Sequence, residues 1–406
     1  MIRHSLTGKP DRERVACEAR GMLSRSRSSL VLVSTLFVLA AGCSSSGSKA
    51  ATPTSAGSSS TTTSTAPVKL GHVFVINLEN EDYAASWGAS SPAKYLNGTL
   101  RKQGQLLTQY YGTAHASLGN YIAQISGQAP NPTTQFDCIA YTDFTATGTG
   151  PYGQALGNGC VYPASVKTIG DQLQAAGKTW KAYQEDIGNS LTEPTTCRHP
   201  AIGAGDATNF PTKTDMYATR HDPWVYFHSI IDSPVCAAKV VGLDALTKDL
   251  ASAATTPNLS YITPNVCNDG HDAPCKDGRP GGLTSADAFL KTWVPKILAS
   301  PAYQADGMLV IAFDEAELTG PGADASACCH TPASPNAAKP GRTGPGGGRV
   351  GALVLSRLTK PDTTNATPYN HYALLCSMED VFGLSHLGFA GAPGLTCFGT
   401  DVYNAS

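Results

Sequence analysis

Two mostly apolar segments, His72–Leu78 and Gly307–Phe313, constrain the fold of this chain more than any other feature. Uninterrupted apolar runs of this length are typical of strands that are buried on both faces of a parallel sheet. Each segment is followed directly by two side chains that carry oxygen atoms. The carboxyl ends of strands form the edge at which open α/β sheets bind ligands, so the two pairs are expected to lie there. The pairs are Glu79-Asn80 and Asp314-Glu315.

Helical and strand-like patterns alternate along the rest of the chain. Helices are expected at residues 93–102, 118–126, 166–176, 243–251, 286–299 and 371–382. Further strands are expected at residues 105–110, 179–183, 259–263 and 349–355, and the polar stretch 188–220 is expected to be a surface insertion. This alternation predicts an α/β fold with a mostly parallel central sheet and helices on both faces.

The segment before residue 68 has the features of an export signal and a tether. Residues 30–41 are mostly apolar, follow several arginines and are too short to span a bilayer, as expected of a signal peptide. The signal, residues 1–42, ends at the lipobox-like sequence LAAGC, which predicts cleavage before Cys43 and lipidation of its thiol. Ordinary secretion with a free cysteine is the alternative, and Met22 is an alternative start. Residues 43–67 are rich in Ser and Thr and are expected to be a flexible tether for one domain at 68–406.

The cysteine count agrees with export. Of twelve cysteines, Cys17 would leave with the signal and Cys43 would take the lipid, so an even number remains for disulfides. Two local pairs are expected from their spacing, Cys267 with Cys275 and Cys376 with Cys397. The adjacent Cys328 and Cys329 are expected to pair with two different partners. A metal–thiolate site is not favoured, because no paired CxxC spacing occurs.

Charge and hydropathy exclude some partners. The formal net charge is −2, only 15% of residues are charged, and no basic block follows the tether, which argues against nucleic-acid binding. No second apolar segment is long enough to span a membrane, so an anchor would be the lipid on Cys43. The protein is therefore expected outside the cytoplasm, either attached to the cell membrane by this lipid or secreted.

Ser117 lies at the expected start of the helix at 118–126. Serine is among the preferred N-cap residues, and this structural role is the simpler interpretation. The alternative is catalytic, because a helix N-terminus directs backbone N–H groups toward an anion and metal coordination can activate a hydroxyl for nucleophilic attack. The chain has no GxSxG motif, which argues against an α/β-hydrolase.

The two oxygen-bearing pairs predict a metal site. One such pair after a strand would be interpreted as a solvated turn, whereas two pairs at strand ends favour a shared ligand. Carboxylate and amide oxygens suit magnesium, calcium or manganese, and carboxylates also bind zinc and iron, so the identity of the divalent ion stays open. The expected ligands are Glu79, Asn80, Asp314 and Glu315, with the Ser117 hydroxyl directed at the same ion.

Three histidines are further candidates. His271 follows the expected strand 259–263 and either lies in a hydrogen-bonded turn, contacts a phosphoryl group or protonates a leaving oxygen. His371 precedes the last helix, where a cap or surface role and a site role are equally supported. His115 either lines the pocket near Ser117 or packs in the core. The glycine-rich segment 341–349 lacks the GxxxxGK[ST] pattern and precedes a strand, so it is interpreted as a flexible rim loop.

Five segments together resemble the bacterial phosphoesterase family. This family includes secreted acid phosphatases, phosphatidylinositol-3-phosphate phosphatases and non-haemolytic-type phospholipases C. The resemblance extends over essentially the whole chain after the tether and follows the family's order. The segments are HVFVINLENEDY (72–83), HASLGNYIAQISG (115–127), PNVCNDGHD (264–272), LVIAFDEA (309–316) and NHYALLCSMEDVFGL (370–384).

The resemblance implies an alkaline-phosphatase-like α/β core and assigns roles by motif. Ser117 would be a metal-bound nucleophile that forms a phosphoserine. His271 would lie near the phosphate, and His371 matches the histidine that opens the family's last helix, so both are catalytic candidates. The metal would be held by Glu79, Asn80, Asp314 and Glu315.

The expected function is hydrolysis of phosphate monoesters by an exported acid phosphatase, with a phosphoinositide or another phospholipid among the candidate substrates. The chain lacks the additional C-terminal domains of the larger phospholipases, and Ala316-Glu317-Leu318 replaces their Gly-Gly-Phe type continuation. Both departures favour a monoesterase. A phospholipase C-like phosphodiesterase is the alternative within the family. A non-catalytic surface-binding lipoprotein is less favoured, because the full set of expected site residues is retained.

Overall fold

A mostly parallel sheet of eight strands forms the centre of the protein in the computed structural model, which describes residues 69–405. The strand order is β11-β2-β10-β9-β1-β8-β6-β7, and only β10 runs antiparallel to its neighbours. The predicted α/β class is confirmed. The strands are β1 (His72–Leu78), β2 (Gln105–Leu107), β6 (Trp180–Gln184), β7 (Val240–Gly242), β8 (Leu259–Thr263), β9 (Gly307–Phe313), β10 (Ala352–Ser356) and β11 (Thr363–Asn365).

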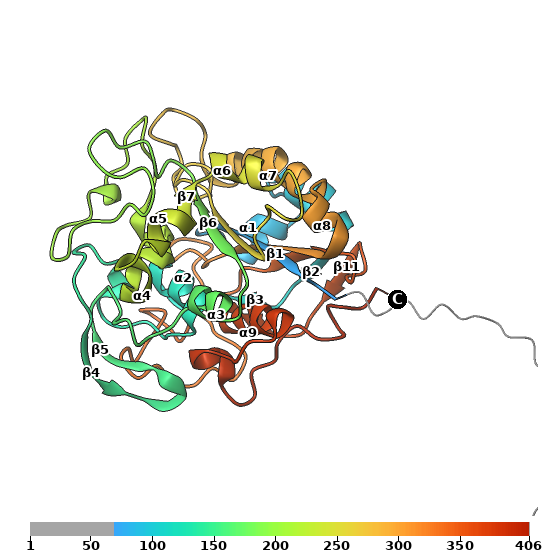
Figure 1. Cartoon of the computed structure of the whole chain (residues 1–406). Coiled ribbons are helices and arrows are strands. Elements are labelled where there is room, and N and C mark those ends of the chain that lie inside the picture. The colour runs from blue at the N-terminus through green and yellow to red at the C-terminus, as the bar shows by residue number, and fades with distance from the viewer. Residues whose placement is uncertain (1–68, 406) are drawn as a thin grey trace, which may run out of the picture. The chain divides into compact units, whose positions relative to one another are not determined.

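Helices cover both faces of this sheet (Figure 1). On one face α2, α3 and α9 contact one another, and on the other face α7 packs against α8, with α6 lying over β6 and β7. Burial on both faces explains why the central strands are continuous apolar runs. The helices are α1 (Tyr83–Trp87), α2 (Ser117–Ser126), α3 (Ile169–Ala175), α4 (His228–Ile231), α5 (Val235–Lys239), α6 (Asp244–Asp249), α7 (Gly282–Leu298), α8 (Pro301–Asp306) and α9 (His371–Phe382).

The two segments that dominate the sequence lie side by side as β1 and β9. They are parallel, with His72 opposite Gly307 and Leu78 opposite Phe313, so both strands end at the same level. The strand β8 pairs with the other side of β1, also in parallel. The residues that follow all three strands therefore lie at one edge of the sheet.

Most predicted elements are present, and the differences occur where the chain is short or exposed. The bounds of β1, β8, β9 and α9 agree with the prediction. The expected helix at 93–102 is instead a π-helix, Tyr95–Leu100, followed by a 3₁₀ turn, Arg101–Gln103. The expected strand at 105–110 is divided into β2 and the short β3 (Tyr110–Tyr111), which pairs with β12 (Tyr369–Asn370).

An exposed hairpin was not predicted from the sequence. It consists of β4 (Thr145–Thr149) and β5 (Ala155–Asn158). Every residue of β4 is exposed, so its Thr- and Gly-rich sequence has no apolar alternation that would predict a strand. The helix α2 ends as predicted at Gly127, which adopts the left-handed conformation that favours glycine at this position (φ 66°).

Five disulfides link the ten cysteines of the described residues. The predicted pairs Cys267–Cys275 and Cys376–Cys397 are confirmed. The prediction that Cys328 and Cys329 have different partners is wrong: they pair with each other, because every other cysteine of the domain is already paired. The remaining disulfides are Cys138–Cys160 and Cys197–Cys236.

The predicted signal peptide, lipobox cysteine and tether lie outside residues 69–405. Within that range, no helix has both the length and the apolar character needed to cross a membrane.

Candidate active site

The sheet edge brings three of the predicted residues together. Glu79 and Asn80 follow β1, Asp314 follows β9, and the backbone N–H of Asn80 donates to Asp314 Oδ1 at 3.1 Å. Asn80 has a positive φ of 53°, so the chain turns sharply as soon as the strand ends. Glu79 and Asp314 are fully buried, and Asn80 lines an open cleft above them.

Ser117 lies beside this pair at the first residue of α2. Its hydroxyl donates to Glu79 Oε2 at 2.8 Å, and the residue lines the same cleft. It does not cap the helix: Ala116 is the N-cap residue, and the Asp137 carboxylate accepts the N–H of Leu118 at 2.9 Å. The structural interpretation of Ser117 as an N-cap is therefore wrong. One of the helix N–H groups expected to bind an anion is already bonded to Asp137.

His221 and Asp269 complete a cluster that sequence reasoning did not select. His221 Nδ1 is 3.0 Å from Asp269 Oδ2, and His221 Nε2 is 3.5 Å from Glu79 Oε2. One ligand atom of each of these three residues lies within 4.8 Å of the others. Asp269 belongs to the strand-end segment that contains His271 and could have been selected with it. His221 lies in a 3₁₀ turn after the polar insertion, and no pattern in the sequence marks it.

Burial and mutual repulsion dominate the electrostatics of the cluster. Desolvation, followed by the negative charges of Asp314 and Asp269, raises the pKa of Glu79 well above its usual value. Desolvation also raises the pKa of Asp269 strongly and that of Asp314 to about 7. Burial lowers the pKa of His221 well below its usual value, so this imidazole is neutral and can act as a ligand.

These residues fit a divalent cation. Glu79 Oε1, Asp314 Oδ2 and His221 Nε2 are buried and have no hydrogen-bond partner among residues 69–405. Buried carboxylates normally have a cation or several donors as partners, and a cation would satisfy these atoms together. Carboxylate oxygens with one imidazole suit manganese, zinc or iron as well as magnesium.

Glu315 and His115 form a buried pair beside the cluster. His115 Nδ1 contacts Glu315 Oε2, and His115 Nε2 lies 2.9 Å from the backbone oxygen of Asp324. Glu315 lines the cleft, whereas His115 is fully buried and does not. The histidine thus packs behind the cleft and orients the Glu315 carboxylate.

His271 lines the cleft, and the buried Arg220 lies beside it. The Nδ1 of His271 is 2.9 Å from Asp272 Oδ1, and its Nε2 is 3.3 Å from Arg220 Nη2. The guanidinium of Arg220 places a positive charge next to this ring, which suits contact with phosphoryl oxygens. Arg220 was not selected from the sequence.

His371 lies behind Asp314, outside the cleft. It is fully buried: Nδ1 is 3.0 Å from the Tyr110 hydroxyl, and Nε2 is bonded to the backbone oxygen of Asp314. Burial lowers its pKa to about 4, so the ring is neutral. Asn370, not His371, caps α9. These contacts describe a residue that positions Asp314, and the cap and surface interpretations are wrong.

The glycine-rich segment 341–349, interpreted from the sequence as a flexible rim loop, lies beside the cleft but packs tightly at Gly347. The N–H of Gly347 donates to the backbone oxygen of Gly112 at 3.0 Å. A Cβ on Gly347 would lie 2.3 Å from the backbone oxygen of Ala114, so only glycine fits there. At the start of the segment, the side chain of Arg342 is exposed and lines a groove next to the cleft.

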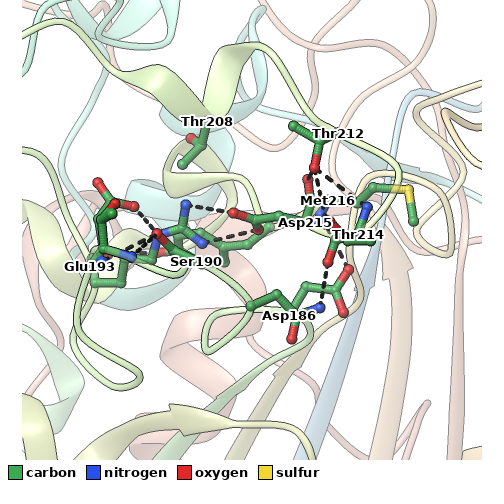
Figure 2. Close-up of polar contacts among 12 residues, drawn as sticks. Asp186, Ser190, Glu193, Thr208, Thr212, Thr214, Asp215 and Met216 are labelled. Atoms are coloured by element: carbon green, nitrogen blue, oxygen red, sulfur yellow. Dashed lines mark hydrogen bonds and ion pairs between the residues drawn. The ribbon is translucent and has the colours of Figure 1, made fainter.

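A network of polar contacts holds the insertion that precedes His221 (Figure 2). Arg198 forms a bidentate pair with Asp215, at 3.0 and 2.8 Å, and also bonds Glu193. The Asp186 carboxylate accepts the N–H of Met216 at 3.2 Å and thereby ties the insertion to the end of β6 (Figure 2). The predicted surface insertion thus carries Arg220 and leads directly into His221.

A model of the Phosphoesterase family matches residues 90–385. The chain is 25% identical to the probable acid phosphatase of Kluyveromyces lactis over 320 residues, 78% of this chain and 59% of that protein. It is 24% identical to the phosphatidylinositol-3-phosphatase of Mycobacterium tuberculosis over 326 residues, 80% of this chain and 81% of that protein. An acid phosphatase of Aspergillus fumigatus is 25% identical, over 61% of this chain and 45% of that protein. The chain thus spans about half the length of the fungal relatives.

The fold of this chain is also similar to that of solved structures. A protein of the alkaline phosphatase superfamily from Vibrio parahaemolyticus superposes with a TM-score of 0.44 and 13% identity, over 78% of this chain and 67% of that chain.

Proposed function

The chain belongs to the Phosphoesterase family, and from that premise we propose that it hydrolyses phosphate monoesters through Ser117. The observation that carries the proposal is the hydrogen bond from the Ser117 hydroxyl to Glu79, inside a buried group of carboxylates that have unpartnered oxygens. A hydroxyl at the base of an open cleft, beside ligands for a cation, suits nucleophilic attack on a phosphoryl group. Relatives named acid phosphatase support the choice of a monoester.

In the first step, the Ser117 oxygen bonds to phosphorus while the bond from phosphorus to the ester oxygen breaks. The Ser117 proton passes to Glu79 Oε2, to which the hydroxyl donates at 2.8 Å, and it returns to the serine oxygen when the phosphoserine is hydrolysed. The departing alcohol takes up a proton from solvent, because the cleft is open. Water then attacks the phosphoserine, releases phosphate and restores the hydroxyl.

Glu79, Asp314 and His221 would hold a divalent cation through their unpartnered atoms, with Asn80 and Glu315 on the cleft wall. When bound, such an ion would lower the pKa of the Ser117 hydroxyl and neutralise charge on the phosphoryl oxygens. The ligand set leaves the identity of the ion open. His371 supports this group from behind by fixing the backbone oxygen of Asp314.

Arg220 and His271 would bind the phosphoryl oxygens that face away from the carboxylates. Arg220 is buried, and its guanidinium contacts His271, which lines the cleft. The positive charge of this guanidinium beside the cleft suits a dianionic group.

Export and lipid attachment at Cys43 form a separate part of the proposal. The five disulfides of residues 69–405 support export, because disulfides persist mainly outside the cytoplasm. In cells fed a labelled fatty acid, we expect the full chain to be labelled and Cys43→Ala to be unlabelled and released into the medium. Equal labelling of both chains would contradict lipidation at this residue.

The catalytic proposal is tested with the purified full chain, para-nitrophenyl phosphate and the corresponding phosphorylcholine ester. We expect preference for the monoester, loss of activity on chelation and recovery with a divalent ion. Ser117→Ala should lose on the order of a thousandfold or more in kcat. Ser126→Ala, in the same helix but outside the cleft, is the matched control. Full activity of Ser117→Ala would refute the nucleophile, and strong preference for the diester would favour the phospholipase C-like alternative.

A further inference from the structure

A groove with apolar walls adjoins the cleft at the residue before the proposed nucleophile. Ala116 and Asp137 line both the cleft and the groove. Away from Ser117 the groove is lined by Phe136, Ile139 and Phe210, among others, and its volume is about 730 Å³. A volume of this size is typical of small-molecule sites.

The apolar side chains of this groove are unusually exposed. Phe136, Ile139 and Phe210 have 53%, 66% and 82% of their surface accessible, and they are three of the six large exposed apolar side chains in residues 69–405. Single exposed apolar residues need no explanation, but a cluster of them beside a reactive cleft is typical of a binding surface. A ligand that places an apolar group in the groove would cover these three side chains.

The backbone holds the two walls of the groove together. One wall contains Phe136 and Ile139, the other runs from Gly205 to Phe210, and the N–H of Asp206 donates to the backbone oxygen of Ile139 at 3.0 Å. The guanidinium of Arg342 lies 4.6 Å from the centre of the Phe136 ring and restrains that ring. The walls of the groove are thus held in place by contacts within the chain.

Arg220 connects the groove to the phosphate side of the cleft. Its Nη1 is 3.3 Å from Asn209 Oδ1, on the groove wall, and its Nη2 is 3.3 Å from His271 Nε2 in the cleft. A monoester whose phosphate lies between Ser117 and His271 would have its alcohol portion next to the apolar walls, because Ala116 and Asp137 belong to both the cleft and the groove.

We propose that this groove is a leaving-group subsite that selects phosphate monoesters whose alcohol is apolar close to the ester oxygen, such as aryl and alkyl phosphates, over polyol phosphates. The inference rests on the proposed function, because it places the phosphate at Ser117. The groove also contains polar residues such as Asp206 and Asn209, but a sugar or glycerol moiety would place hydroxyl groups against the Phe136 and Phe210 side chains, which offer no hydrogen bonds, and this costs binding energy.

The test measures kcat/KM of the full chain for methyl, propyl and hexyl phosphate, with glycerol phosphate as the polar counterpart of propyl phosphate. We expect about twofold gain per methylene, since each is partly buried, which gives roughly thirtyfold between the methyl and hexyl esters. Propyl phosphate should exceed glycerol phosphate. The combined variant Phe136→Ser/Phe210→Ser should reduce the hexyl-to-methyl ratio to less than about fivefold.

Leu191→Ser is the matched control, because Leu191 is also fully exposed but does not line the groove. It should keep the wild-type ratio. A wild-type chain that hydrolyses methyl phosphate with a hexyl-to-methyl ratio near one would overturn the subsite and leave the proposed function intact. An unchanged ratio in the combined variant, or a preference for glycerol phosphate, would also overturn it. A wild-type chain that hydrolyses none of the esters would overturn the proposed function together with the subsite.

Discussion

The two sides of the cleft are held in place by different kinds of interaction. Glu79 and Asp314 follow adjacent parallel strands, and the backbone ladder between β1 and β9 fixes their separation. Arg220 and His221 lie at the end of a long insertion that is held by side-chain contacts, chiefly Arg198 with Asp215 and Glu193. The sheet side is thus positioned by the fold as a whole, and the loop side by a few contacts that single substitutions can remove.

This difference separates the expected effects of mutations. Substitutions on the sheet side should change the chemistry and the bound metal while the fold remains intact. Substitutions in the insertion should lower stability and move His221 and Arg220, with partial loss of activity.

The largest effect is expected for Asp314→Asn. The substitution keeps the volume of the side chain and its contact with the Asn80 N–H. It removes the negative charge of the carboxylate, whose Oδ2 has no hydrogen-bond partner. We expect kcat to fall on the order of a thousandfold, with loss of bound metal measured by elemental analysis and an unchanged circular dichroism spectrum. Retention of metal and of more than a tenth of the activity would show that Asp314 is not a ligand.

Without metal, the stability of the folded chain should fall as pH rises. Acidic residues with lowered pKa values have the opposite effect. In the folded chain the pKa of Asp314 is raised to about 7, so its protonated form is favoured by folding. This stabilisation is present below the unfolded-state pKa of about 4 and is lost as pH rises through about 7. In chelator we therefore expect the melting temperature to fall between about pH 5 and pH 8, and added metal to restore most of it at the upper end.

The variant Asp314→Asn serves as the control for this pH effect, because an amide resembles the protonated acid. In chelator at about pH 8 it should melt above the wild-type chain. Glu379, whose pKa is raised to about 9 by burial, contributes in the same direction in both chains and cancels in their difference. The upward pKa shifts of Glu79 and Glu315 are reduced in the variant, because after burial the charge of Asp314 is their next cause, and this adds to the difference. Identical melting curves of the two chains in chelator would contradict the assigned shift.

On the loop side, Arg198→Met should have an intermediate effect. The Arg198 side chain is 6% exposed and its removal leaves the Asp215 carboxylate without a partner for its bidentate contact. We expect the free energy of unfolding to fall by about 2–3 kcal/mol and metal affinity to fall about tenfold, because His221 is displaced.

Arg279→Met is the matched control, since Arg279 is 45% exposed and pairs with Asp277 at the surface. Its effect on the free energy of unfolding should be within about 0.5 kcal/mol. Equal effects of the two substitutions in thermal melts would show that the buried network does not hold the insertion.

The same difference explains how much of the site the sequence could predict. Glu79 and Asp314 were predictable because a long apolar run indicates a buried strand, and parallel strands bring their carboxyl ends together. His221 and Arg220 were not, because a 3₁₀ turn after a polar insertion has no periodicity to read, and its position depends on contacts such as Arg198–Asp215. The central strands followed from hydropathy for the same reason, whereas the exposed β4–β5 hairpin did not.

The positions of the histidines in the sequence were not sufficient to predict their roles. His371 opens its helix, as the resemblance implied, but only its contact with the backbone oxygen of Asp314 shows that the ring lies behind this residue and outside the cleft. His115 is close to Ser117 in sequence, yet its ring points to Glu315. Two residues that are close in sequence have neighbouring backbones, but their side chains can point in different directions.

The smallest effect is expected for Tyr217→Phe, which tests whether the insertion is held by many contacts or by the ion pairs alone. The buried Tyr217 hydroxyl is 2.9 Å from the backbone oxygen of Arg198 and 3.1 Å from Asp222 Oδ2, next to His221. Its loss should lower the free energy of unfolding by about 1 kcal/mol and kcat/KM only a few-fold. Tyr152→Phe, at an exposed tyrosine, should change neither. A loss in Tyr217→Phe as large as that in Arg198→Met, measured by chemical denaturation, would mean that the hydroxyl and the ion pairs act as one cooperative unit, so that the loop side is as strongly coupled as the sheet edge.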